Sequence, residues 1–294
     1  MPVRRSSSRN ADTGVIMTND VAMGVGSSAK GPESRSEEPT RVTWLGHASV
    51  LIELAGLRIV TDPVLRERMG VLRRRRDLEP VAAPSAVDAV LISHLHHDHA
   101  DLPSLHLLSE AGDAPLPVLT EGSNSGWVRR QGLHAPEVSP AGWHRLSDDV
   151  EVRLVPAVHD ARPMPHRPNG AVGMLIRGSG VVVWFAGDTA LYSDMDTLPS
   201  IAEAPIDLAL LPVGGWGPRL SAGHMGAAEA AEAAVRSGAR AVMPIHYGTL
   251  HPRGWPSSRL DWTTAPGDAL PAELSQRCSA EAHVLPVGRT MTLT

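Results

Sequence analysis

Short apolar runs alternate with breaks rich in glycine and proline along most of the chain, a pattern typical of a protein that mixes strands and helices. In the first part of this pattern, two apolar runs joined at Ala55-Gly56 indicate a hairpin, and a continuous run indicates a buried strand followed by a helix. The expected elements are the hairpin Val42–Leu54 with Leu57–Val60, the strand Val87–Ile92 and the helix Ala100–Glu110.

In the second part, predicted strands alternate with predicted helices. Gly178-Ser179-Gly180 joins two of these strands as a turn. Strands are expected at Val150–Val155, Ala171–Ile176, Val181–Phe185, Ile206–Pro212 and Ala241–Ile245, and helices at Met225–Ser237 and Ala269–Cys278. A last strand, His283–Val287, is predicted to close the fold.

Residues 1–40 differ from the rest of the chain. They contain no aromatic residue, they hold the only lysine (Lys30), and they carry clusters of serine, glutamate and proline. Such a segment cannot bury enough apolar surface to offset the entropy lost on ordering. We predict a disordered tail over residues 1–40 and one domain over residues 41–294.

Composition and charge exclude several classes of function. The formal net charge is −5 and aromatic residues make up 3% of the chain, so neither a general attraction to nucleic acid nor a stacking surface for single strands is expected. Cys278 is the only cysteine, which rules out an intrachain disulfide. No apolar run approaches the roughly 20 residues of a membrane-spanning helix. We expect a cytoplasmic protein with no nucleic-acid partner and no stable membrane insertion.

The candidate chemistry begins in the run His94-Leu95-His96-His97-Asp98-His99, which holds four of the 14 histidines. On extended backbone, His94 and His96 alternate and can therefore point to the same side. Imidazole nitrogens and carboxylate oxygens are the ligands that zinc accepts. A solvated histidine-rich loop is the alternative interpretation of this run.

Three further polar residues favour the metal interpretation. His159, Asp188 and His246 each follow an apolar strand directly. The loops that follow the strands of an α/β sheet are where such folds build their sites. We therefore predict that these residues converge on the histidine-rich run.

These residues, in this order, resemble the metal signature of the metallo-β-lactamase superfamily of binuclear hydrolases. The segments 43–49, 61–63, 185–189 and 244–249 are similar to the branch that contains L-ascorbate-6-phosphate lactonase and N-acyl-phosphatidylethanolamine-hydrolysing phospholipase D. The resemblance implies an α+β fold, the four-layer αββα sandwich, with two metal ions at one edge between the sheets.

The resemblance also implies the ligands. His94, His96 and His159 would bind one ion, Asp98, His99 and His246 the other, and Asp188 both. Two ions about 3.5–4 Å apart can share a hydroxide that attacks the substrate. Asp98 is therefore expected to act as a catalytic residue as well as a metal ligand. The ligand types favour two Zn²⁺, with Mn²⁺ or Fe²⁺ left open. Asp62 would orient a metal-binding histidine by a hydrogen bond, and His97 is expected to face away.

His47 and His224 are the candidates for contacting a substrate. His224 precedes a predicted helix, where the helix dipole favours an anion. A plain residue at a helix start is the alternative for His224. Arg162 and His251 are further candidates, and the loop Ala161–Gly170 is expected to cover the site and set specificity. The run Arg73–Arg76 is predicted to be a solvated loop.

The function expected from these residues is metal-dependent hydrolysis of an ester, lactone or phosphodiester bond in a small molecule, with anionic substrates among the candidates. Two alternatives stay open. The first is a catalytically silent metal-binding or interaction protein that retains the fold, and the second is a nuclease of the same superfamily.

Overall fold

A computed structural model describes residues 38–159, 167–215, 217, 219–255 and 261–293, which belong to one unit of the chain, Glu33–Thr294. The predicted tail lies outside the described residues except for its last three. Of these, Thr40 is buried and its carbonyl accepts a hydrogen bond from the Leu293 amide at 2.9 Å. The folded domain therefore includes Thr40, slightly before the predicted boundary.

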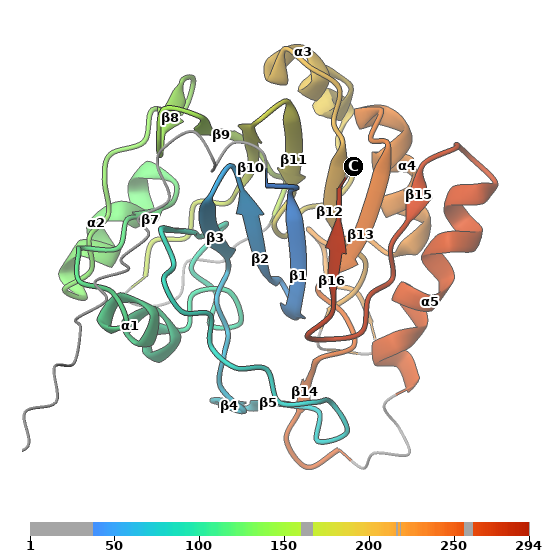
Figure 1. The fold of residues 1–294 in the computed structure, drawn as a ribbon. Helices are drawn as coiled ribbons and strands as arrows, with labels where there is room; N and C mark the ends of the chain where they lie inside the picture. The colour runs from blue at the N-terminus through green and yellow to red at the C-terminus, as the bar shows by residue number, and fades with distance from the viewer. Residues whose placement is uncertain (1–37, 160–166, 216, 218, 256–260, 294) are drawn as a thin grey trace, which may run out of the picture. The chain divides into compact units, whose positions relative to one another are not determined.

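The first large sheet has the strand order β16-β1-β2-β3-β6-β7 (Figure 1). Its strands are β1 (Arg41–Gly46), β2 (Ser49–Leu54), β3 (Leu57–Thr61), β6 (Ala89–Leu91), β7 (Val118–Leu119) and β16 (Thr290–Thr292). β1, β2 and β3 are antiparallel, whereas β3, β6 and β7 are parallel. The run predicted as one strand over Val42–Leu54 is two strands, because the chain reverses where Gly46 and His47 have φ values of 105° and 54°.

The second large sheet has the order β15-β13-β12-β11-β10-β9-β8. Its strands are β8 (Trp143–Arg145), β9 (Val150–Pro156), β10 (Val172–Gly178), β11 (Val181–Phe185), β12 (Leu208–Pro212), β13 (Ala241–Ile245) and β15 (Glu281–Ala282). A small third sheet joins β4 (Arg68–Met69), β5 (Leu72–Arg74) and β14 (Leu250–Pro252). The strands β11 and β13 have the predicted bounds.

The helices lie on both sides of the strands in Figure 1, with α1 and α2 on one side and α4 and α5 on the other. They are α1 (Leu102–Glu110), α2 (Gly122–Arg130), the 3₁₀ helix η2 (Ser193–Thr197), α3 (Leu198–Ala202), α4 (Ala227–Ser237) and α5 (Asp261–Ser275). α1 begins where the side chain of Asp101 accepts a hydrogen bond from the Ser104 amide. Within the described residues, no helix is long and apolar enough to cross a membrane.

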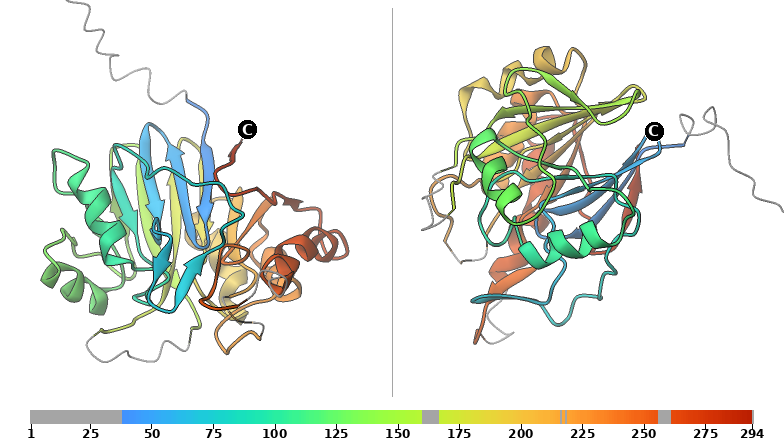
Figure 2. Two further views of the ribbon diagram at one scale, coloured as in Figure 1. Left: turned by 90° about the horizontal axis from the view of Figure 1, so that it is seen from below. Right: turned by 90° about the vertical axis from the view of Figure 1, so that its left-hand side faces the viewer.

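Successive side chains along a strand point to opposite faces of the sheet, and this alternation divides the apolar interior into two cores. On β2, Val50 and Ile52 belong to the same core as Trp184 of the second sheet. Leu51, which points the other way, belongs to the core that contains Trp127 of α2. The further views in Figure 2 show the two large sheets face to face, with helices outside them. The predicted four-layer α+β sandwich is confirmed.

The strand predicted at His283–Val287 is wrong. This segment forms no strand, because Pro286 lacks an amide proton and the chain turns at Gly288, where φ is 82°. The strand that closes the fold is β16, which pairs antiparallel with β1 at the edge of the first sheet.

The arginine run is less solvated than predicted. Arg74 belongs to β5, and its guanidinium donates to the carbonyls of Leu45 at 3.0 Å and Val64 at 3.1 Å. Arg75 donates to Thr263 Oγ1 at 2.8 Å. Only Arg76 of the four is exposed. These contacts attach the β4–β5 hairpin to the body of the domain.

α5 begins earlier than predicted, at Asp261, although Pro266 and Gly267 argue against a helix there. The helix packs against α4 and β13, and this tertiary packing overrides the weak local preference. Position 267 has room only for glycine, because a Cβ there would overlap the ring of Tyr247.

Gly267→Ala should therefore destabilise the protein. We expect overpacking against Tyr247 to lower the free energy of unfolding by about 1–3 kcal/mol. Alanine is otherwise the better helix former by about 1 kcal/mol, so Gly126→Ala in α2 should stabilise, since its Cβ would lie 3.6 Å from the nearest atom, Arg130 Nη1. Urea denaturation of both variants measures these changes. A change of the same sign in the free energy of unfolding of both variants would contradict the packing argument.

Candidate metal centre

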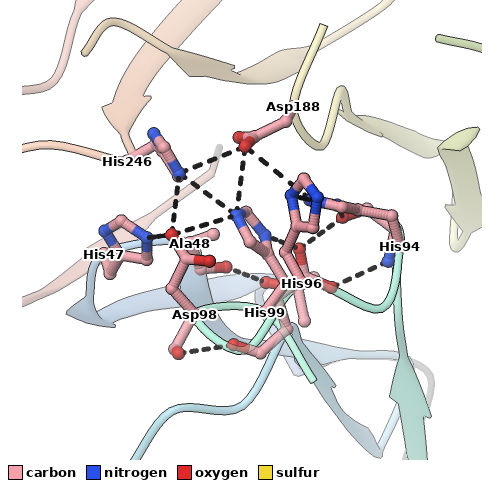
Figure 3. Close-up of polar contacts among 12 residues, drawn as sticks. His47, Ala48, His94, His96, Asp98, His99, Asp188 and His246 are labelled. Carbon is pink, nitrogen blue, oxygen red and sulfur yellow. Dashed lines mark hydrogen bonds and ion pairs between the residues drawn. The ribbon is translucent and has the colours of Figure 1, made fainter. Parts of the chain in front are cut away.

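Loops from both large sheets bring histidine and aspartate side chains together at one end of the sheets (Figure 3). The segment 94–99 follows β6, Asp188 follows β11 and His246 follows β13. Short buried strands thus deliver the polar residues that follow them to a common place. The groups whose ligand atoms lie within 4.8 Å of one another are His94, His96 and His159; His47, Asp98, His99 and His246; Asp62, His94 and His99; and His159, Asp188 and His224.

The first donor set is formed by three imidazoles. His96 Nδ1 lies 2.8 Å from His94 Nε2 and 3.2 Å from His159 Nε2. The outer nitrogens of two rings are occupied, because His159 Nδ1 donates to the Gly223 carbonyl at 3.0 Å and His94 Nδ1 lies 2.9 Å from the Ser93 hydroxyl. Ligands of a tetrahedral zinc ion, bound at about 2.0–2.1 Å, are separated by about 3.3 Å. The spacing fits one ion.

The second donor set combines two imidazoles and a carboxylate. His99 Nε2 and His246 Nε2 lie 3.1 Å apart, and Asp98 Oδ2 lies 3.9 Å from the first and 3.7 Å from the second. His246 Nδ1 donates to the Gly214 carbonyl at 2.9 Å, and His99 Nδ1 donates to Asp62 Oδ2 at 2.6 Å. In its neutral form each ring therefore presents the lone pair of Nε2 to the interior of the cluster.

Asp188 lies between the two sets. Its Oδ2 is 3.2 Å from His99 Nε2 and 3.3 Å from His246 Nε2 in the second set, and 3.9 Å from His94 Nε2 in the first. Its Oδ1 is buried and has no hydrogen-bond partner among the described residues. A buried carboxylate oxygen without a partner is costly unless a cation binds it. Asp188 thus lies within reach of both donor sets.

Asp62 occupies the position behind His99 that the sequence suggested. This fully buried carboxylate accepts hydrogen bonds from the Ser93 amide at 2.7 Å, the Ser93 hydroxyl at 2.6 Å and His99 Nδ1. Because the Ser93 hydroxyl donates its single hydrogen bond to Asp62, it accepts a hydrogen bond from His94 Nδ1. One carboxylate therefore sets the tautomers of a histidine in each donor set.

The backbone between His94 and His96 is held by two residues of the loop Ala161–Gly170, which the sequence predicted to cover the site. Asn169 Oδ1 accepts from the Leu95 amide at 2.6 Å, and Arg167 Nη1 donates to the Leu95 carbonyl at 3.0 Å. More than 70 residues separate these partners, and no sequence signal indicates them. Residues 161–166 of this loop, which include Arg162, lie outside the described residues.

Burial and charge place most of these groups in the protonation states of metal ligands. Burial, opposing any charge, lowers the pKa of His94 well below its usual value and the pKa of His96 to about 4. Burial alone would raise the pKa of Asp98 and Asp188, but the surrounding histidines hold both well below the usual range. Neutral imidazoles and ionised carboxylates are the forms that bind metal ions.

His99 differs from the other rings. Burial acts against its charge, yet Asp188, Asp62 and Asp98 outweigh this effect and raise its pKa well above the ordinary value. Asp188 and Asp98 lie near His99 Nε2, and Asp62 contacts His99 Nδ1. The negative charge of these carboxylates stabilises positive charge at the His99 ring. The electrostatics of the cluster thus favour a bound cation.

The two predicted substrate contacts occupy different places. His47 is only 1% exposed, with Nε2 3.2 Å from Asp98 Oδ2, and burial lowers its pKa to about 3. It contacts the same Asp98 oxygen that faces His99 and His246, belongs to their donor group, and is not among the residues that line the pocket in front of the cluster. His224 does line that pocket, with Nε2 3.2 Å from Asp188 Oδ2 and Nδ1 3.0 Å from the Ser221 hydroxyl. It precedes α4 by three residues.

The remaining histidines of the sequence argument lie outside the donor groups. His97 is exposed and is not part of any donor group among the described residues. It borders the pocket in front of the cluster. His251 lies in β14, where its Nδ1 donates to the Pro252 carbonyl at 2.9 Å.

Comparisons with known proteins agree with this geometry. An uncharacterised protein of Mycobacterium tuberculosis is 32% identical over 235 residues, which cover 74% of this chain and 62% of that protein, so the chain spans less than two thirds of this relative. A UPF0173 metal-dependent hydrolase of Methanosphaerula palustris is 31% identical over 86% of this chain and 100% of its own length.

Among solved structures, a metallo hydrolase of the archaeon Ignicoccus hospitalis has the same fold, with a TM-score of 0.67, 21% identity, and coverage of 87% of this chain and 99% of that one. The family model described as the beta-lactamase superfamily domain matches residues 57–247, which contain all seven sequence-predicted metal ligands. The chain belongs to the beta-lactamase superfamily domain family.

Proposed function

We propose that this protein is a binuclear metal-dependent hydrolase. The observation that carries the proposal is the position of Asp188, whose Oδ2 lies within 3.9 Å of histidine nitrogens from both donor sets while its buried Oδ1 has no partner among the described residues. Relatives named as metal-dependent hydrolases, such as that of Methanosphaerula palustris, support hydrolysis as the reaction class.

In this proposal each donor set holds one ion. His94, His96 and His159 would hold the first ion, Asp98, His99 and His246 would hold the second, and Asp188 would contact both. Nitrogen and oxygen donors without a thiolate fit Zn²⁺, with Mn²⁺ and Fe²⁺ as alternatives. When bound, such a pair of ions supplies a water that ionises near neutral pH and a positive charge beside the oxyanion that develops in hydrolysis.

The chain's own residues prepare this site. Asp62 fixes His99 by accepting from its Nδ1, and His47 holds Asp98, so we assign His47 to positioning and not to substrate contact. His224 faces the pocket, and although burial opposes its charge, Asp188 raises its pKa. A protonated His224 can donate a hydrogen bond to a substrate oxygen.

The pocket in front of the cluster has a volume of about 400 Å³, which suits a small molecule. We propose an ester, lactone or phosphodiester bond as the target, in line with the resemblance to the lactonase and phospholipase branch. A catalytically silent metal-binding protein and a nuclease are the two alternatives that experiment must separate.

Metal content tests the ligand assignment. His94→Ala and His246→Ala should each reduce the content from about two ions per chain to about one, because each removes a ligand from a different set. His97→Ala is the matched control and should leave the content unchanged, since His97 belongs to neither set. Elemental mass spectrometry of the purified variants measures this. Equal loss in all three variants would show the assignment to be wrong.

Asp62→Asn tests the tautomer argument without changing the size of the side chain. We expect metal affinity to fall by about 10- to 100-fold, because the amide cannot hold the Nδ1 proton of His99 as a carboxylate does. Asp148→Asn, at an exposed carboxylate, is the control. Competition with a chromophoric chelator measures both affinities, and an unchanged affinity for Asp62→Asn would refute the role.

Turnover tests the reaction class. The metal-loaded protein should hydrolyse members of a panel of carboxylic esters, lactones and aryl phosphodiesters, and Asp98→Asn should lower the rate by at least about 100-fold. Metal uptake with no turnover of any member would support the silent alternative. Cleavage of oligonucleotides with binding that weakens steeply with salt would support the nuclease.

A further inference from the structure

The pocket beside the metal cluster has a second wall of a different chemistry. Asp98, Asp188 and His224 lie on the cluster side. The opposite wall is the β4–β5 hairpin, which contributes Met69, Gly70, Val71 and Leu72. A substrate whose scissile bond reaches the cluster therefore extends along an aliphatic surface.

This wall is held in place by strand pairing and by packing. Met69 pairs with Leu72 across the hairpin, and β14 pairs with the other edge of β5. The Arg253 amide also donates to the Val71 carbonyl at 2.8 Å. Beneath the hairpin lies a small apolar core of its own, formed by Val64, Met69, Leu72 and Leu250. The tip residues are thus held in a defined position.

Val71 stands out within this wall. Its side chain is 71% exposed, and it belongs to none of the apolar cores. It follows Gly70, whose φ of 52° turns the hairpin at this point. A large aliphatic side chain that the fold does not bury, and that borders the pocket beside candidate catalytic residues, is available to bury apolar surface of a ligand.

The pocket offers little for an anionic group away from the reacting bond. Arg66, the arginine among its described lining residues, is held by Asp101 through Nε at 2.9 Å and through Nη2. Arg219 borders a separate cavity of about 210 Å³, which shares His224 with this pocket.

We infer that the substrate is an uncharged carboxylic ester or lactone with an aliphatic group that lies against Met69, Val71 and Leu72. This inference rests on the proposed hydrolase function and deepens it by naming the substrate class. Hydrolysis adds one water across the acyl C–O bond: a new C–O bond forms from the water oxygen, the bond to the alcohol oxygen breaks, and that oxygen takes up a proton. A volume of about 400 Å³ limits the aliphatic group to a short or medium chain.

Binding of alkyl hydroxamic acids tests the inference without requiring turnover. A hydroxamate chelates metal ions, so the series from acetohydroxamate to octanohydroxamate places tails of increasing length in the pocket of the metal-loaded protein. We expect affinity by calorimetry to rise about threefold to fourfold per methylene until the wall is covered. Val71→Asp should remove most of this increase and leave acetohydroxamate binding unchanged, since the short ligand does not reach the hairpin.

Val235→Asp is the matched control, because Val235 is an exposed valine on α4 that does not line the pocket. This variant should keep the full dependence on chain length. The monohydroxamate of adipic acid, which carries a carboxylate at the end of its tail, should bind more weakly than hexanohydroxamate. Tighter binding of the charged tail would overturn the inference.

The outcomes separate the inference from the function on which it rests. Acetohydroxamate binding without any gain from longer tails would overturn the inference and leave the metal centre standing, as would an equal loss for all ligands in Val71→Asp. Failure of metal-loaded samples to bind acetohydroxamate at all would count against the proposed metal centre, and the inference would fall with it.

Discussion

The burial of ionised carboxylates among imidazoles is the constraint on which the rest of this structure depends. Asp98 and Asp188 are nearly inaccessible to solvent, yet their pKa values lie well below the ordinary range. Removing such charges from water is unfavourable unless opposite charge compensates. Histidines supply part of this compensation, and the approach of His99 Nε2, His246 Nε2 and Asp188 Oδ2 to within about 3.3 Å fits a further cation between them.

Such a cluster needs a rigid support, because imidazoles bind a metal ion only in the correct tautomer and orientation. Backbone carbonyls of Gly223 and Gly214 and the carboxylate of Asp62 take up the outer nitrogens of three rings. The loop itself is held at Leu95, where Asn169 and Arg167 bind the amide and the carbonyl. The two sheets thus supply not only the donors but also the hydrogen bonds that aim them.

The fold positions this centre without determining the substrate, since one fold hosts many activities. Beside the cluster, the β4–β5 hairpin of the third, small sheet forms an aliphatic wall. Two arginines at the end of this hairpin bind the body of the domain: Arg74 donates to two carbonyls, and Arg75, which follows β5, donates to Thr263. The charge of these two arginines is therefore directed into the domain, and the hairpin side of the pocket is aliphatic.

Local sequence patterns determined the parts of this protein that depend on near neighbours. Buried strands such as Val181–Phe185 and Ala241–Ile245 were predictable from continuous apolar runs. The run His94–His99 was recognisable because its donors are adjacent in the chain, and the α+β class followed from the resemblance that these residues carry. Polar residues placed directly after apolar strands also indicated which distant positions join the run.

Only the tertiary structure decided features that arise from contacts between distant segments. The closing strand is β16 and not His283–Val287, and α5 forms across Pro266 because α4 and β13 pack against it. His47 contacts Asp98, Asn169 holds Leu95, and Val71 borders the pocket, although nothing in the neighbouring sequence of each indicates this. Local preferences are weak compared with the burial and hydrogen bonding that the assembled layers impose, so these positions become defined only when the sheets come together.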